Sequence, residues 1–321
     1  MPEIVIEGQV HQRPIHIQKN CLYLCPIYMI SHIINPSILV QCSQSASHMI
    51  STPELKELMH SVNSISMQAG KVILEYYNSD YDVSIKQDKS PVTSADLAAN
   101  EHIEQKLQAL TPEIPRISEE SAKLPYESRK HWDYMWLIDP LDGTRQFIKN
   151  KPDFTVNIAL IHRHRPILGS IYLPVEQTLY YACDEAGAHK QMHGQISEDI
   201  HVCQTPPKIL RICANQSGHS KTMQYFLKMV NDYQLISRGS SIKSCLVAEG
   251  SADIYPRIGP TWEWDTAAAQ CILEQAGGSI TDLTLDRLVY NKASLLNPSF
   301  IAHANQQYDW RKYFPKYQQS D

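Results

Sequence analysis

The chain has 321 residues, of which 43% are apolar and 20% are charged, and its formal net charge is −5. This composition is typical of a globular protein and excludes a disordered or collagen-like chain. The acidic balance argues against a protein that binds long nucleic acid, which would carry a basic surface. A small anionic ligand stays compatible with it, because a bound metal ion or a local Lys/Arg cluster can reverse the sign of the potential.

The first 48 residues differ from the rest. From Cys21 to Pro53 the sequence contains no Asp, Glu, Lys or Arg, and much of this stretch is apolar. Pro26 and Pro36 interrupt it, which disfavours a membrane-spanning helix of about 20 residues. The apolar run also begins too late for an ordinary signal peptide. We expect residues 1–48 to be a non-native or unstructured extension, with a targeting segment as the alternative.

A helix is predicted to begin directly after this segment. Ser51 offers a hydroxyl cap, Pro53 fits the first turn, and Glu54 adds an acid, a combination typical of a helix start. Apolar residues then recur at helical spacing as far as Tyr76. A second amphipathic helix follows Asp96. Its apolar side is expected to carry Leu97, Ile103, Leu107 and Leu110.

Strands are predicted in the middle of the chain. A short strand from Pro115 leads into a loop, and the apolar run 134–138 indicates a buried strand. Three further strands are expected to form an antiparallel meander. They are Phe154–Ile161, Ile167–Leu173 and Thr178–Cys183.

The second half of the chain alternates strands and helices from Ile209 to Ala276, which favours an α/β arrangement. The stretch 184–205 is polar and contains two glycines, so we place a junction near it. The predicted organisation is an N-terminal α+β metal-binding subdomain at 49–190 and a C-terminal α/β subdomain at 191–321.

The strongest chemical signal is the run from Asp139 to Thr144, which reads Asp-Pro-Leu-Asp-Gly-Thr. A buried strand delivers Asp139 and Asp142 into a turn that Pro140 and Gly143 are expected to fix. Magnesium prefers hard oxygen ligands such as carboxylates, so this turn could hold it. Taken alone, however, the motif is more often a solvated acidic turn.

Two further acids belong with this motif. Glu119 lies 20 residues upstream of Asp139, and Asp265 stands at the start of a predicted helix. Each also has an ordinary explanation. Glu119 could be an acid of a surface loop, and Asp265 could cap its helix with a gain of about 1 kcal/mol.

The three segments together resemble the three signatures of the inositol monophosphatase superfamily, in the same order and at fitting separations. The segments are Glu119–Ser121, Asp139–Thr144 and Trp264–Ala268. The resemblance spans roughly residues 52–305. It implies an α/β (α+β) fold built as a layered α-β-α-β-α sandwich. An antiparallel sheet would lie in the first half and a mixed or parallel sheet in the second.

The resemblance also implies two or more Mg²⁺ ions. Glu119, Asp139 and the carbonyl of Leu141 would hold one ion, and Asp139, Asp142 and Asp265 the second. Four carboxylates within about 5 Å would repel each other by roughly 3 kcal/mol per pair at an effective dielectric of 20. Two divalent cations neutralise four negative charges. Two metals can also clamp a phosphoryl group and activate water.

Asp96 and Thr144 are the implied catalytic partners of Glu119. In the family, the matching residues orient the attacking water. From the residues alone, Asp96 could equally compensate the dipole in the first turn of its helix. Both interpretations stay open at the level of the sequence.

The residues around the motifs resemble those of the bacterial-type 3'(2'),5'-bisphosphate nucleotidases of this superfamily. In those enzymes the residues matching Ser240, Lys243 and Arg257 bind the nucleotide away from the reacting phosphate. Arg can grip a second phosphate bidentately and Lys as a point charge, although Lys243 and Arg257 could also be surface charges. The resemblance implies additional substrate contacts from Glu119, Asp142, Gly143, Thr144 and Asp265.

The implied reaction is hydrolysis of the 3'-phosphate of 3'-phosphoadenosine 5'-phosphate, a by-product of sulfur assimilation, to AMP and phosphate. 3'-Phosphoadenylyl sulfate is a further implied substrate, and inhibition by lithium is expected. The alternatives are an inositol or sugar monophosphatase and a non-catalytic regulatory member of the same fold. Loss of a metal carboxylate would mark the regulatory alternative, and the sequence shows no such loss.

The expected partner is a small-molecule bisphosphate nucleotide, with no long nucleic acid and no integral membrane segment. The eight cysteines form no paired C-x-x-C pattern, so free thiols in a reducing cytosol are expected. The expected location is therefore cytoplasmic. The resemblance adds peripheral association with the cytoplasmic face of the inner membrane as a second possibility.

Overall fold

The structure, a computed structural model, describes residues 49–86, 90–121, 123–205, 208–214, 220–304 and 310–314. The expectations for residues 1–48 lie outside this part of the chain. No helix within the described ranges is both long enough and apolar enough to cross a bilayer. The cytoplasmic location and the peripheral membrane contact stay predictions.

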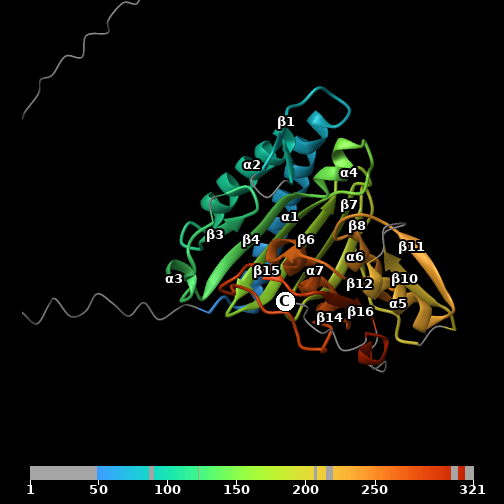
Figure 1. The fold of residues 1–321 in the computed structure, drawn as a ribbon. Coiled ribbons are helices and arrows are strands. Elements are labelled where there is room, and N and C mark those ends of the chain that lie inside the picture. Colours follow the sequence, from blue (N-terminus) through green and yellow to red (C-terminus); the bar gives the residue numbers. More distant parts are fainter. Residues whose placement is uncertain are drawn as a thin grey trace, which may run out of the picture. The chain divides into compact units, whose positions relative to one another are not determined.

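Helices and two sheets account for most of the described chain (Figure 1). The helices are α1 (Thr52–Tyr76), α2 (Ser94–Leu110), α3 (Tyr126–Arg129), α4 (Thr144–Ile148), α5 (Lys221–Val230), α6 (Ile242–Ala248), α7 (Glu263–Gln275) and the 3-10 helix η2 (Trp310–Tyr313).

The larger sheet has seven strands in sequence order, and only its first pair, β3 with β4, is parallel. The strands are β3 (Arg116–Ser118), β4 (Tyr134–Asp142), β5 (Thr155–His162), β6 (Arg165–Leu173), β7 (Thr178–Cys183), β8 (Gly187–Met192) and β9 (Glu198–Asp199).

The smaller sheet has five strands in the order β11-β10-β12-β16-β14, and it is mixed. β10 pairs in parallel with β11 and β12, whereas β16 is antiparallel to β12 and β14. The strands are β10 (Leu210–Ala214), β11 (Tyr233–Ser237), β12 (Ile254–Arg257), β14 (Ser279–Asp282) and β16 (Phe300–His303). Two short ribbons pair β1 (Val83–Ile85) with β2 (Pro91–Thr93) and β13 (Thr261–Trp262) with β15 (Leu296–Asn297).

The elements stack in five layers. Helices α1 and α2 cover one face of the larger sheet, and α6 and α7 lie between the two sheets (Figure 1). Helix α5 and η2 cover the outer face of the smaller sheet. The layered α-β-α-β-α fold implied by the family resemblance is confirmed.

The first helix begins where it was predicted, whereas α2 begins at Ser94, two residues before Asp96. The backbone N–H and hydroxyl of Ser51 both donate to Glu54 Oε2, at 2.9 and 2.7 Å. The predicted inner side of α2 is partly wrong, because Leu110, the last residue of the helix, is exposed and so is Leu97. Small residues, Ala95 and Ala99, replace it on the buried side and let α2 approach its neighbours closely.

Helix α7 is buried on nearly all sides because it lies between two sheets. Its middle is a run of alanines, and Gly169 of β6 faces it. A Cβ atom placed on Gly169 would lie 2.4 Å from the carbonyl oxygen of Ala268. The missing side chain therefore sets how closely α7 approaches the larger sheet.

The stretch 184–205 contains two strands that the sequence analysis did not predict. β8 continues the meander by pairing with β7, and β9 pairs with β8. The proposed subdomain boundary at residues 190–191 falls inside β8. The division into two subdomains stays a prediction.

Substitution of Gly169→Ala should destabilise the protein by about 1–3 kcal/mol, because the new methyl group would force α7 away from β6. Urea unfolding followed by circular dichroism measures this change. An unfolding free energy equal to that of the wild type would show that the spacing between α7 and the sheet is not set at this contact.

Candidate metal centre and anion pocket

The two aspartates of the acidic turn project to the same side of the larger sheet. Asp139 pairs with Asn157, but Asp142 pairs with Thr155, so three steps along β4 match two steps along β5. In a regular strand, residues three apart would point to opposite faces. The extra residue of this bulge brings Asp139 and Asp142 onto one face. The sequence predicted a turn here. The structure instead has a bulge within β4, which continues to Asp142.

Glu119 is placed beside Asp139 by parallel pairing of β3 with β4. The register aligns Ser118 with Ile138, and the Glu119 N–H continues it by donating to the Ile138 carbonyl at 3.0 Å. The two acids therefore follow equivalent positions on neighbouring strands.

Asp265 reaches the same place from the N-terminus of α7. Its Oδ2 atom accepts a hydrogen bond from the Trp262 N–H at 2.9 Å, so it also caps the helix. The next residue back, Trp264, donates its indole N–H to Glu119 Oε2 at 3.2 Å. Asp265 therefore caps α7 and also lies among the acids of the cluster.

Glu119, Asp139 and Asp265 form one cluster. Each offers a carboxylate oxygen, and these oxygens lie within 4.8 Å of one another. Burial, reinforced by the negative charge of Glu119 and Asp142, raises the pKa of Asp139 well above its usual range. Burial and the charge of Asp142 likewise raise the pKa of Asp265. Hard oxygen ligands that repel one another at this spacing fit a divalent cation.

Lys86 contacts this cluster through Glu119. Its Nζ atom lies 2.8 Å from Glu119 Oε1 and 2.6 Å from Glu120 Oε1. Burial acts to lower the pKa of Lys86, but the two carboxylates outweigh it and raise that pKa overall. Lys86, which directly follows β1, was not predicted as a site residue from the sequence.

Asp142 is not one of these three acids, although its charge raises the pKa of Asp139 and of Asp265, and its Oδ2 atom accepts three hydrogen bonds. The Ser240 hydroxyl donates to it at 2.6 Å and the Ser241 N–H at 2.7 Å. Asn157 donates from its amide nitrogen at 3.4 Å. Ser241 and Asn157 were not predicted, because they reach Asp142 from other parts of the chain.

Asp96 and Thr144 are brought together by the fold. The Thr144 hydroxyl donates to Asp96 Oδ1 at 2.9 Å, and the Leu141 carbonyl lies 3.3 Å from the same hydroxyl. Asp96 Oδ2 accepts the Thr93 N–H at 2.8 Å, so Asp96 also caps α2. Burial raises the pKa of Asp96 despite these hydrogen bonds. Gly143, between the bulge and Thr144, adopts a φ of 104°, which favours glycine.

A cavity of about 110 Å³ adjoins the acidic cluster. Asp142 and Asp265 line it together with two cations, Lys243 and Arg257. Its other lining residues are Ser240, Ser241, Ser244, Tyr255, Thr261, Thr266 and Phe300. Acidic and basic groups therefore share one cavity, which suits an anionic ligand that a metal ion also contacts.

The two cations of this cavity differ in their contacts. Lys243 is buried, and its Nζ atom donates to the carbonyls of Ser240 and Arg238 at 2.8 and 3.3 Å. Burial lowers the pKa of Lys243 to about 8. Arg257 donates to the Pro260 carbonyl at 3.2 Å, but its Nε atom is buried without a hydrogen-bond partner within the described chain. Such an orphan donor is costly and indicates a missing acceptor.

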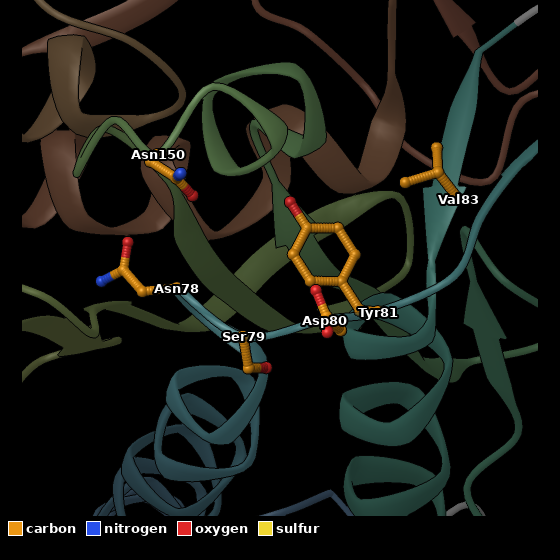
Figure 2. A pocket seen from close by; sticks show the side chains of 6 residues that line it. All are labelled: Asn78, Ser79, Asp80, Tyr81, Val83 and Asn150. Carbon is orange, nitrogen blue, oxygen red and sulfur yellow. The ribbon is translucent and has the colours of Figure 1, made fainter.

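A larger hollow of about 680 Å³ lies beside the loop after α1, where Tyr81 and Asn150 face each other across it (Figure 2). Its described lining offers one carboxylate and no Lys or Arg. The lining residues are Asn78, Ser79, Asp80, Tyr81, Val83 and Asn150. This composition does not suit a phosphate, so the smaller cavity is the better candidate site.

The sequence matches the inositol monophosphatase family over residues 54–315. Among curated relatives, a 3'(2'),5'-bisphosphate nucleotidase CysQ of Salmonella typhimurium is 42% identical over 246 residues, which are 76% of this chain and 98% of the relative. The CysQ nucleotidase of Haemophilus influenzae is 37% identical over 261 residues, covering 81% and 97%. The resemblance inferred from the motifs is confirmed.

Solved structures agree with this match. CysQ from Bacteroides thetaiotaomicron, described as a bacterial member of the inositol monophosphatase family, superposes with a TM-score of 0.67 at 37% identity, covering 78% of this chain and 97% of that one. An inositol monophosphatase from Anabaena has a TM-score of 0.63 at 23% identity, covering 81% and 94%. The second similarity supports the fold alone.

Substitution of Lys86→Gln should strengthen binding of Mg²⁺ alone by several-fold, because a positive charge beside the carboxylates competes with the incoming cation. Isothermal titration calorimetry measures the affinity. Lys130→Gln is the control, since Lys130 pairs with Glu127, an exposed residue of α3 outside the cluster. Weaker Mg²⁺ binding in Lys86→Gln would mean that Lys86 supports the metal site instead of competing with it.

Proposed function

The chain belongs to the inositol monophosphatase family, and we propose that it is a 3'(2'),5'-bisphosphate nucleotidase that hydrolyses the 3'-phosphate of 3'-phosphoadenosine 5'-phosphate. The products are AMP and phosphate, and 3'-phosphoadenylyl sulfate is a second candidate substrate because its 3' end is the same. Members of this family are metal-dependent phosphatases. The curated relatives are named bisphosphate nucleotidases, which favours this activity over that of an inositol or sugar monophosphatase.

One observation carries the choice of substrate. A single cavity is lined by Asp142 and Asp265 and also by Arg257, whose buried Nε atom has no hydrogen-bond partner within the described chain. A substrate with two phosphates can meet a metal ion held by the acids and the Arg257 side chain at once. A singly phosphorylated sugar would leave the buried Nε atom of Arg257 without an acceptor, which costs about 1–3 kcal/mol.

The metal centre is proposed to hold two or more Mg²⁺ ions. Glu119, Asp139 and the Leu141 carbonyl would hold one, and Asp139, Asp142 and Asp265 another. Bound metal would neutralise the phosphoryl oxygens and lower the pKa of water. The oxygens of Glu119, Asp139 and Asp265 already converge within 4.8 Å, which supports this assignment.

Asp96 and Thr144 are proposed to prepare the attacking water. Because the Thr144 hydroxyl donates its hydrogen to Asp96, its oxygen keeps lone pairs free to accept a hydrogen bond from the water. Asp96 is held in place by its capping bond to Thr93, so the pair needs little reorganisation. Thr144 and Glu119 would together orient the water toward phosphorus.

Substrate binding is proposed to involve Gly143, Thr144, Ser240, Lys243 and Arg257, besides the metal ligands. Gly143 and Thr144 begin α4 next to Asp142, where the reacting phosphate would lie. Arg257 would bind the second phosphate directly. Lys243 would add its charge to the same phosphate and also support the backbone of Ser240, to which it is hydrogen bonded.

Asp142→Asn should reduce phosphate release to less than about a tenth of wild type, because the amide is a poorer cation ligand and cannot accept at both of its terminal atoms. Metal-dependent phosphate release measures this. The thermal unfolding temperature should stay close to that of wild type. Activity above a tenth of wild type in a folded variant would count against a metal-binding role for Asp142.

Arg257→Ala should lower kcat/KM for the bisphosphate nucleotide by roughly 10- to 150-fold, because a charge-assisted contact of about 1.5–3 kcal/mol is lost. Hydrolysis of a singly phosphorylated sugar should change little. Lys243→Ala should affect both substrates, since Lys243 also holds the Ser240 carbonyl. Equal losses on both substrates in Arg257→Ala would show that Arg257 supports the fold and not a second phosphate.

A further inference from the structure

The turn at residues 238–241 connects the smaller sheet to α6, and it delivers two donors to one atom. The Ser240 hydroxyl and the Ser241 N–H both donate to Asp142 Oδ2. In this position Ser240 adopts a φ of 53°, which lies in the left-handed region that non-glycine residues rarely adopt. Something must therefore hold the turn in this conformation.

Asp153 holds the turn from the other side. Its Oδ2 atom accepts the Gly239 N–H at 2.7 Å, and its Oδ1 atom accepts the Arg238 Nε–H at 2.9 Å. Asp153 itself lies two residues before Thr155, where β5 begins, so it is anchored to the larger sheet. Arg238 also pairs with Glu176, which makes no hydrogen bond to the turn's backbone within the described chain.

Two glycines make this contact possible. A Cβ atom on Gly239 would lie 2.8 Å from both the Cβ and the carbonyl oxygen of Asp153. A Cβ atom on Gly143 would lie 2.9 Å from the same carbonyl oxygen. The residue after Asp142 and the residue before Ser240 thus both press against Asp153. A displacement of Asp153 would therefore shift two neighbours of Asp142, namely Gly143 and the 238–241 turn.

We infer that Asp153 is a positioning residue for the metal centre: it fixes the 238–241 turn, and through Ser240 and Ser241 it fixes Asp142. The inference rests on the proposed role of Asp142 as a metal ligand. Two donors on Oδ2 set the rotation of the Asp142 carboxylate and so determine where its other oxygen points. Outer contacts of this kind typically change metal affinity by about 10- to 100-fold.

The test uses Mg²⁺ alone, without substrate, and isothermal titration calorimetry on the full chain. Asp153→Ala removes both acceptors. Gly239→Ala moves the turn by an independent route, because its new methyl group would collide with Asp153. Asp153→Asn keeps an oxygen that can accept the Gly239 N–H, so it should restore part of the affinity. Glu176→Gln is the matched control, since it removes a carboxylate from the Arg238 side chain but leaves the backbone hydrogen bond of the turn to Asp153 in place.

We expect Asp153→Ala and Gly239→Ala each to weaken Mg²⁺ binding by about tenfold, with a smaller loss in Asp153→Asn and no more than about a twofold change in Glu176→Gln. Thermal unfolding of each variant identifies any that does not fold. If Asp153→Ala fails to fold, Gly239→Ala and Asp153→Asn decide. Folded variants that bind Mg²⁺ as tightly as Glu176→Gln would overturn the inference.

The same titration separates this inference from the proposed function. A wild-type protein that binds Mg²⁺ but does not hydrolyse 3'-phosphoadenosine 5'-phosphate would overturn the nucleotidase proposal. The effect of Asp153 on Mg²⁺ affinity would still be decided by the variants.

Discussion

Carboxylates that repel one another converge at one point of the larger sheet. Glu119, Asp139 and Asp265 place oxygens within 4.8 Å of each other, and burial raises the pKa of two of them. Keeping such groups together costs free energy unless a cation neutralises them. The fold nevertheless brings these three acids together from the end of β3, from β4 and from α7. It is therefore organised around a site for positive charge.

Around this site, residues that cap helices or bend a strand also contribute side chains to the site. Asp96 caps α2 while accepting the Thr144 hydroxyl, and Asp265 caps α7 while facing the other acids. The bulge of β4 places Asp139 and Asp142 on one face. Because the carboxylates of Asp96 and Asp265 each accept a backbone N–H, they need little reorganisation when a ligand binds, which is the requirement for electrostatic catalysis.

The sequence predicted the longer elements and most residues of the candidate site, but not the contacts that hold these residues. Spacing and composition identified the longer helices, the three-strand meander and the alternating second half, but not the short helices α3 and α4. The strand β8 was missed because its sequence is polar, and pairing with β7 overrides that weak propensity. The bulge depends on register with β5, and the contacts of Lys86 and Ser241 join segments 33 and 99 residues apart. Local pattern contains no information about such pairings.

The central claim is that one metal-dependent site distinguishes a substrate with two phosphates from a substrate with one. The most direct measurement is phosphate release from 3'-phosphoadenosine 5'-phosphate and from inositol 1-phosphate, with and without Mg²⁺. The account predicts release that requires Mg²⁺ and a kcat/KM for the bisphosphate nucleotide at least about tenfold higher, the smallest effect of one charge-assisted contact. Equal or higher kcat/KM for inositol 1-phosphate, or release without metal, would contradict it.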